Sequence, residues 1–134
     1  IRGRIFREVS VHGTLIQYLA HENAKLDALY YCPHLPDGSI PEYSFVCECR
    51  KPAPGMLLKA QQHFDIDFSQ SFMIGDKATD VEVGQRVGCH TILLRTGYGE
   101  KVLKGQYQYI PHAHYIMANL YEAFEKVLKP FFGI

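Results

Sequence analysis

Three cysteines and one histidine gather in a short stretch near the middle of the sequence. Cys32 and His34 are separated by one residue, and Cys47 and Cys49 repeat that spacing after a gap of twelve. Cysteine and histidine at short, regular spacing are typical metal ligands, and three sulfurs with one imidazole close a tetrahedral zinc site that has no open position. The pattern predicts a structural zinc loop over residues 32–49.

The residues inside this stretch favour a loop that needs support. Pro36, Asp37, Gly38 and Pro41 interrupt any regular element and leave little apolar material to pack, so a bound metal would supply the missing stability. Two other interpretations remain open at this point. The three thiols could be buried beside a solvated histidine, or two of them could form a disulfide.

Two cations, Arg50 and Lys51, follow the last cysteine directly. Adjacent cations are most often solvated surface charge. Here they lie between the metal loop and a turn that Pro52 and Pro54 restrict, so their direction is constrained. We expect them to contact an anionic group such as a phosphate.

The whole sequence limits the class of protein. At 134 residues it is long enough for a single domain, over residues 1–134, and 14 basic residues balance 14 acidic ones. This balance gives no support for binding to nucleic acid or to an anionic membrane, and no apolar run approaches the length of a membrane span. No signal peptide is visible, and clustered thiols fit a reducing compartment, so we expect a cytoplasmic protein.

Apolar periodicity predicts an alternation of helices and strands. Helices are expected over about 9–23, 55–63, 80–87 and 116–128, and strands over 26–32, 71–74, 90–94 and 107–110. Such alternation is typical of an α/β fold with a parallel sheet, in which ligands bind beyond the carboxyl ends of the strands. The stretch from Arg95 to Gly99 is expected to be a flexible loop.

One of these predicted strands runs straight into an acidic turn. Gly75 is followed by Asp76 and Lys77, and Asp80 falls in the first turn of the next helix. Carboxylate oxygen at the tip of a strand suits Mg²⁺, so Asp76 is the expected ligand. Asp80 is expected to cap the helix or to support the site from behind, and Lys77 is either solvated or a phosphate contact.

Three other features are expected to be structural. Cys89 reads as a small core residue rather than a nucleophile, because no base accompanies it. His112 and His114 form a possible metal pair, but no cysteine or carboxylate supports them. Asp65 and Asp67 have the spacing of a catalytic carboxylate pair, but they lie in a helix-to-strand turn.

Two segments together resemble the haloacid dehalogenase (HAD) superfamily. The segment from Lys51 to Gly55 is similar to its third motif, and Ile-Gly-Asp76-Lys-Ala-Thr-Asp80 is similar to its fourth. The zinc loop with the following Arg-Lys-Pro-Ala-Pro-Gly resembles the heptose-bisphosphate phosphatases of this superfamily, and the related histidinol-phosphate phosphatases have a similar loop. The resemblance implies a Rossmann-like three-layer sandwich around a parallel sheet.

The resemblance also implies a reaction, namely hydrolysis of a phosphomonoester through a covalent aspartyl-phosphate with Mg²⁺. The partner would be a small phosphorylated sugar, as in the carbohydrate metabolism that feeds lipopolysaccharide biosynthesis. A histidinol-phosphate phosphatase is the alternative, although its cationic substrate would favour carboxylates over Arg50. The implied site residues are Lys51 for the transferred phosphoryl group, Arg50 and Lys77 for the substrate, Asp76 for Mg²⁺, Asp80 behind it, and Cys32, His34, Cys47 and Cys49 for zinc.

The sequence departs from the superfamily in one respect. The nucleophile motif Asp-x-Asp-Gly of the first strand and the Ser/Thr of the second motif do not occur in it. We therefore expect an N-terminally incomplete phosphatase domain that is inactive alone and has an open sheet edge. That edge would take a missing N-terminal segment or a second copy of the chain. A catalytically inactive zinc-binding or interaction domain is the other possibility.

Overall fold

The structure, a computed structural model, describes residues 2–107 and 111–134. It divides into two compact units, Ile1–Arg50 and Lys51–Ile134. The zinc-loop residues belong to the first unit, and the acidic turn belongs to the second. The expectation of one domain over the whole chain stays a prediction. Among the described residues, none of the helices combines the length and apolar character needed to cross a membrane.

The first unit consists of one long helix and an extended, largely irregular segment. Helix α1 spans Arg2–His21, so it begins earlier than predicted. It ends where Asn23 takes a left-handed backbone (φ 56°) and the Ala24 N–H donates to the Leu19 carbonyl. The predicted strand over 26–32 is wrong: this segment pairs with no strand in the described part of the chain. An apolar run forms a strand only where a neighbouring strand accepts its backbone hydrogen bonds, so pattern alone misled the prediction.

The second unit contains a parallel sheet, as predicted. Its strands are β1 (Phe72–Gly75), β2 (His90–Leu94) and β3 (Tyr115–Met117), in the order β1-β2-β3. Helix α3 (Ala78–Val87) connects β1 to β2 and ends at Gly88, which has the left-handed backbone (φ 85°) that a glycine adopts without strain. The α/β class is therefore confirmed.

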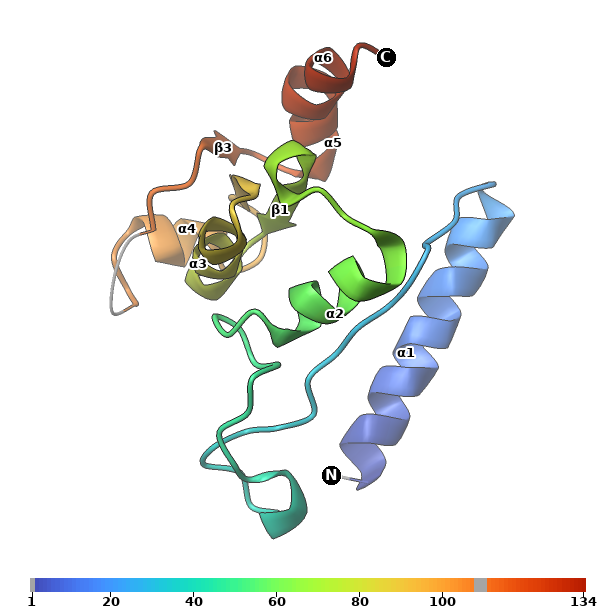
Figure 1. The fold of residues 1–134 in the computed structure, drawn as a ribbon, viewed down its shortest axis with the longest axis vertical. Helices are drawn as coiled ribbons and strands as arrows, with labels where there is room; N and C mark the ends of the chain where they lie inside the picture. Colours follow the sequence, from blue (N-terminus) through green and yellow to red (C-terminus); the bar gives the residue numbers. More distant parts are fainter. Residues whose placement is uncertain (1, 108–110) are drawn as a thin grey trace. The chain divides into compact units, whose positions relative to one another are not determined.

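Helices cover both faces of this sheet and make three layers (Figure 1). Successive residues of a strand point to opposite faces, so Ile92 and Leu93, both 0% exposed, enter different cores. Leu93 packs with Val81 of α3 and with Val102. On the other face, Ile92 packs with Ala123 and with apolar residues of the helical segment that follows Ala123. The other helices of the two layers are α4 (Gly99–Leu103) on the side of α3, and α5 (Leu120–Ala123), the π-helical segment η3 (Phe124–Leu128) and α6 (Lys129–Phe132) on the opposite side.

The C-terminal third differs from the prediction in three places. The helix expected over 116–128 begins only at Leu120, because Asn119 caps it by accepting the Glu122 N–H at 2.9 Å, and β3 occupies the residues before it. Helix α4 starts at Gly99, at the end of the stretch predicted to be a loop. The strand expected over 107–110 falls mostly on residues 108–110, which lie outside the described residues.

A second helix precedes the sheet and ends at the two aspartates that mimic a catalytic pair. Helix α2 spans Gly55–Phe64, and Asp65 terminates it with a left-handed backbone (φ 51°). Asp67 accepts hydrogen bonds from the N–H and hydroxyl of Ser69 and so caps the short 3-10 helix η2 (Phe68–Gln70). Both aspartates lie in turns, as the sequence predicted.

One edge of the sheet carries a wide apolar groove. Strand β1 pairs only with β2 among the described residues, so its other edge is open. A hollow of about 500 Å³ follows this edge. Its lining is mostly apolar and comes from α2, η2, β1 and the C-terminal helices: Leu57, Ile66, Phe68, Gln70, Ser71, Phe72, Met73, Ile74, Cys89, Leu128 and Phe132.

Candidate functional site

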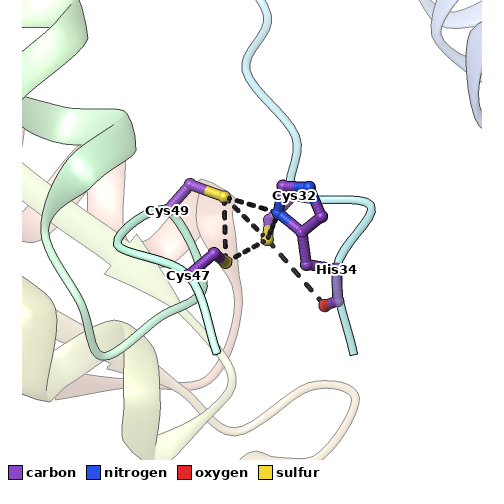
Figure 2. Close-up of side chains that lie close together, drawn as sticks. All are labelled: Cys32, His34, Cys47 and Cys49. Atoms are coloured by element: carbon purple, nitrogen blue, oxygen red, sulfur yellow. Dashed lines mark hydrogen bonds between the residues drawn. The ribbon is translucent and has the colours of Figure 1, made fainter. Parts of the chain in front are cut away.

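The four predicted zinc ligands converge within the first unit (Figure 2). The sulfur of Cys32 lies 3.3 Å from that of Cys47 and 3.0 Å from that of Cys49, and the sulfurs of Cys47 and Cys49 are 3.1 Å apart. The Nδ1 atom of His34 lies 3.3 Å from the sulfur of Cys49 and 3.7 Å from that of Cys32. Three sulfurs and one nitrogen therefore occupy the corners of a small tetrahedron.

This donor set fits zinc. Zinc–sulfur bonds of about 2.3 Å place tetrahedral sulfurs about 3.8 Å apart, so the sulfurs need to move apart by only about 0.5–0.8 Å. A disulfide is excluded, because its sulfurs would be about 2.05 Å apart. All four cysteines lie in the described part of the chain, and all are free thiols.

The ionisation of the thiols agrees with a site for a cation. Burial raises the pKa of Cys47, but hydrogen bonds from Cys49, Cys32 and His34 outweigh it and lower the pKa to about 6. Burial raises the pKa of the Cys49 thiol to about 12, and hydrogen bonds and charge repulsion from Cys32 and Cys47 act in the same direction. The lowered pKa of Cys47 favours its thiolate, which is the form of sulfur that binds a metal ion.

Neighbouring residues fix the orientation of His34. Its ring packs against Phe45, with ring centroids 4.2 Å apart, and the Leu35 N–H donates to the Tyr43 carbonyl at 2.9 Å, which closes the loop. The guanidinium of Arg50 donates to the His34 carbonyl at 3.0 Å. Arg50 is exposed, and its contact within the first unit is with the loop itself; its predicted role in substrate binding stays a prediction.

In the second unit, Lys51 and Asp80 form an ion pair at the carboxyl end of β1. The ammonium of Lys51 donates to Asp80 Oδ1, and the backbone N–H of Lys77 donates to Asp80 Oδ2 at 3.1 Å. The side chain of Asp80 is 6% exposed, whereas that of Lys51 is 35% exposed. Asp80 therefore caps α3, as the sequence suggested, and also fixes the ammonium group, whereas its expected support of a magnesium site stays a prediction.

Asp76 follows β1 and is held by the loop after β2. Its Oδ2 accepts the backbone N–H of Tyr98 at 2.9 Å. Gly97, with φ 59°, passes so close that a Cβ atom there would collide with the same oxygen. One carboxylate oxygen is thus tied to the protein, and the expected role of Asp76 as a magnesium ligand stays a prediction. The parallel sheet brings the two loops together, because the strands that precede them end at the same edge.

Lys77 and Tyr98 lie beside Asp76 and line a second hollow. The Lys77 ammonium lies 4.9 Å from the centroid of the Tyr98 ring, in a cation–π contact. The hollow has a volume of about 270 Å³ and is lined by Lys77, Ala78, Thr79, Tyr98, Val102 and Tyr107. Sequence reasoning missed Gly97, Tyr98 and Tyr107. The signal was the Gly-Tyr-Gly that follows β2, which marks a turn at the ligand-binding edge.

The remaining candidates take structural positions. The Nδ1 atom of His114 accepts hydrogen bonds from the N–H of Thr91 at 3.0 Å and lies 2.8 Å from its hydroxyl, so it ties β2 to the segment before β3. The His112 carbonyl accepts the side-chain amide of Gln85. Cys89 is 6% exposed and lines the apolar groove, as expected of a core thiol.

Comparison with known proteins agrees with this arrangement. The family described as HAD-hydrolase-like matches residues 48–123, which is more than half of the chain. A curated D-glycero-D-manno-heptose-1,7-bisphosphate 7-phosphatase from Thermosynechococcus vestitus is 42% identical over 120 residues, covering 87% of this chain and 61% of the relative. The corresponding D-glycero-beta-D-manno-heptose-1,7-bisphosphate phosphatase from Yersinia pestis is 50% identical over 80 residues, covering 59% of this chain and 43% of its own length.

A solved structure gives the same fold. The D,D-heptose 1.7-bisphosphate phosphatase from B. bronchiseptica, crystallised with magnesium and phosphate, superimposes with a TM-score of 0.75 at 30% identity, covering 90% of this chain and 63% of that one. The chain therefore spans about three fifths of the length of the relatives from T. vestitus and B. bronchiseptica. With the parallel sheet, the acidic turn after β1 and the matched family, this chain belongs to the HAD-like hydrolases.

Proposed function

We propose that this chain forms part of a Mg²⁺-dependent, zinc-stabilised phosphatase that removes the 7-phosphate from D-glycero-D-manno-heptose 1,7-bisphosphate. The observation that carries the proposal is the pairing of Lys51 with Asp80 beside Asp76, at the ligand-binding edge of the sheet. It is supported by the names of the relatives from T. vestitus and Y. pestis, both of which are phosphatases of this substrate.

The residues present fit a magnesium ion. The Tyr98 N–H fixes the Asp76 carboxylate through Oδ2, and Mg²⁺ commonly takes one or two carboxylates together with water and phosphate oxygens. When bound, the ion would offset the negative charge on the phosphate. Lys51, held by Asp80, would bind an oxygen of the transferred phosphoryl group.

The proposed reaction needs a carboxylate nucleophile, for which the printed 134 residues offer no Asp-x-Asp-Gly motif. An aspartate from outside these residues would attack phosphorus, and the sugar oxygen would leave and take up a proton. Water would then hydrolyse the acyl phosphate, which releases inorganic phosphate and restores the carboxylate. Lys51 and the positive end of α3 would stabilise the charge that develops on the phosphoryl oxygens.

The open edge of β1 is where we propose that the strand with this nucleophile adds to the sheet. Its apolar groove of about 500 Å³ supports the idea, because an edge that is unpaired among the described residues, beside partly exposed apolar side chains, favours a further strand. A strand there would end near Asp76, since parallel neighbours finish at one edge. A second copy of the chain is the alternative occupant.

The zinc loop is proposed to be structural rather than catalytic. Four protein ligands leave no position for water or substrate, so the metal would only stabilise a segment with little core of its own. Arg50 donates to this loop, and we propose that it also contacts the anionic substrate from there. Reduced thiols are most stable in the cytoplasm, which is the location we propose.

Phosphate release by the full-length gene product tests the proposal. The substrates are D-glycero-D-manno-heptose 1,7-bisphosphate and histidinol phosphate. The protein is first loaded with zinc, and each substrate is then assayed once with Mg²⁺ and once with EDTA. We expect Mg²⁺-dependent release from the heptose ester. Faster release from histidinol phosphate would favour the alternative enzyme, and no release from either would favour an inactive zinc-binding domain.

A further inference from the structure

The hollow beside Asp76 has the size and lining of a small binding pocket. Its volume of about 270 Å³ is in the range of a single sugar, and its wall combines two tyrosine rings with the buried side chains of Ala78 and Val102. Tyr98 and Tyr107 are 46% and 41% exposed, so much of each tyrosine remains available to a ligand. Sugars present apolar C–H faces that pack on aromatic rings, and their hydroxyls bond to groups at the rim.

The charges around the pocket have one sign. Lys77 contributes an ammonium group, and among the described residues the lining contains no carboxylate. The Tyr98 ring holds that ammonium at 4.9 Å and so limits its freedom. A neutral or anionic ligand is therefore favoured here, whereas a cationic amine would be repelled.

The pocket is also placed next to the reacting group. The Tyr98 N–H binds Asp76, and Lys77 follows Asp76 in the chain, so both lining residues border the proposed phosphoryl site. We infer that this pocket binds the sugar of the substrate, with the tyrosines against its carbon skeleton and Lys77 at an anionic group. Lys77 thus sets the preference against a cationic phosphate ester, and Tyr98 and Tyr107 favour a phosphate ester that carries a sugar; this inference rests on the proposed function.

The test compares substrates in the full-length protein. The readout is kcat/KM for D-glycero-D-manno-heptose 1,7-bisphosphate divided by kcat/KM for acetyl phosphate, which has no sugar. Tyr107→Ala is expected to lower this ratio about tenfold, mainly through KM, and Tyr107→Phe about twofold or less. Tyr121→Ala is the matched control, because Tyr121 is 74% exposed and lies outside the pocket.

Lys77→Glu reverses the charge of the pocket and gives a second measurement. The ratio of kcat/KM for the heptose ester to that for histidinol phosphate is expected to fall at least tenfold, whereas Lys59→Glu, at an exposed position of α2, should leave it unchanged. Equal losses on all substrates in the Tyr107→Ala and Lys77→Glu variants would overturn the inference and leave the proposed function standing.

Binding distinguishes failure of the inference from failure of the proposed function. If the wild-type protein hydrolyses no phosphate ester, the proposed function is wrong, and the sugar pocket is then tested by NMR. Addition of the heptose bisphosphate should shift the ring signals of Tyr98 and Tyr107, and Tyr107→Ala should weaken the binding. Unshifted rings in the wild type would overturn the inference.

Discussion

Lys51 and Asp80, 29 positions apart in the sequence, form an ion pair in which a buried carboxylate holds the ammonium group of a partly exposed side chain. The second oxygen of Asp80 caps α3 through the Lys77 N–H. A single side chain therefore joins the start of a helix to the residue proposed to bind phosphate. Because the ammonium is fixed before substrate arrives, little reorganisation is needed when charge develops on a phosphoryl group.

Removing the carboxylate should destabilise the protein. Asp80→Ala leaves the Lys77 N–H and the Lys51 ammonium without their acceptor, and we expect a loss of about 2–3 kcal/mol in the free energy of unfolding. Urea denaturation measures it. Glu125→Ala is the control, since its pair with Lys129 is exposed and should contribute less than about 0.5 kcal/mol. Equal losses in the two variants would contradict the structural role given to Asp80.

Gly97 should be needed for the site more than for the fold. Gly97→Ala is expected to lower the free energy of unfolding by about 1 kcal/mol, because alanine is strained at a positive φ. The new methyl group should also push the Asp76 carboxylate aside, which should lower phosphate release about a hundredfold. Gly133→Ala is matched in φ (69°) but meets no atom within 4 Å. It should show the stability loss alone, and similar activity of the two variants would refute this explanation.

The zinc loop gives a stoichiometric prediction. Elemental analysis of the purified protein should find one zinc per chain, and Cys49→Ala should lose it, with a lower melting temperature. Cys89→Ala removes a buried thiol outside the cluster and should retain the metal. One zinc in both variants, or none in the wild type, would show that the four atoms converge for another reason.

Cys89 should make stability depend on pH in the alkaline range. Burial raises the pKa of its thiol above the ordinary value of 9.0, so the folded state keeps the proton that the unfolded state releases. The contribution is complete below the unfolded pKa and is lost as pH rises above it. The stability difference between wild type and Cys89→Ala should therefore shrink from pH 8 to pH 10, as measured by urea denaturation. A constant difference would contradict this assignment.

Sequence reasoning succeeded where the pattern is local. Apolar runs predicted the strands around Ile74 and Ile92. Gly88 predicted the end of the helix between them. Sequence reasoning failed for residues 26–32 and for β3, because pairing with a neighbouring strand, rather than composition, decides whether an extended segment is a strand.

The site shows the same division. Short spacing was enough to predict that the four candidate zinc ligands converge. The contacts of Lys51 with Asp80 and of Asp76 with Tyr98 join segments that lie far apart in the sequence. The spacing of residues within one motif cannot predict such contacts. Tyr107 lines its pocket beyond α4, a helix that the sequence did not predict, and so it could not be placed in advance.

Phosphate release by lysine variants of the full-length protein tests the central claim most directly. With Mg²⁺ and D-glycero-D-manno-heptose 1,7-bisphosphate, Lys51→Ala should lower kcat by about a hundredfold or more, because it removes a fixed cation from the phosphoryl group. Lys59→Ala, at an exposed position of α2, should match the wild type. If the Lys51→Ala variant released phosphate as fast as the Lys59→Ala variant, the proposed catalytic role of the Lys51–Asp80 pair would be wrong.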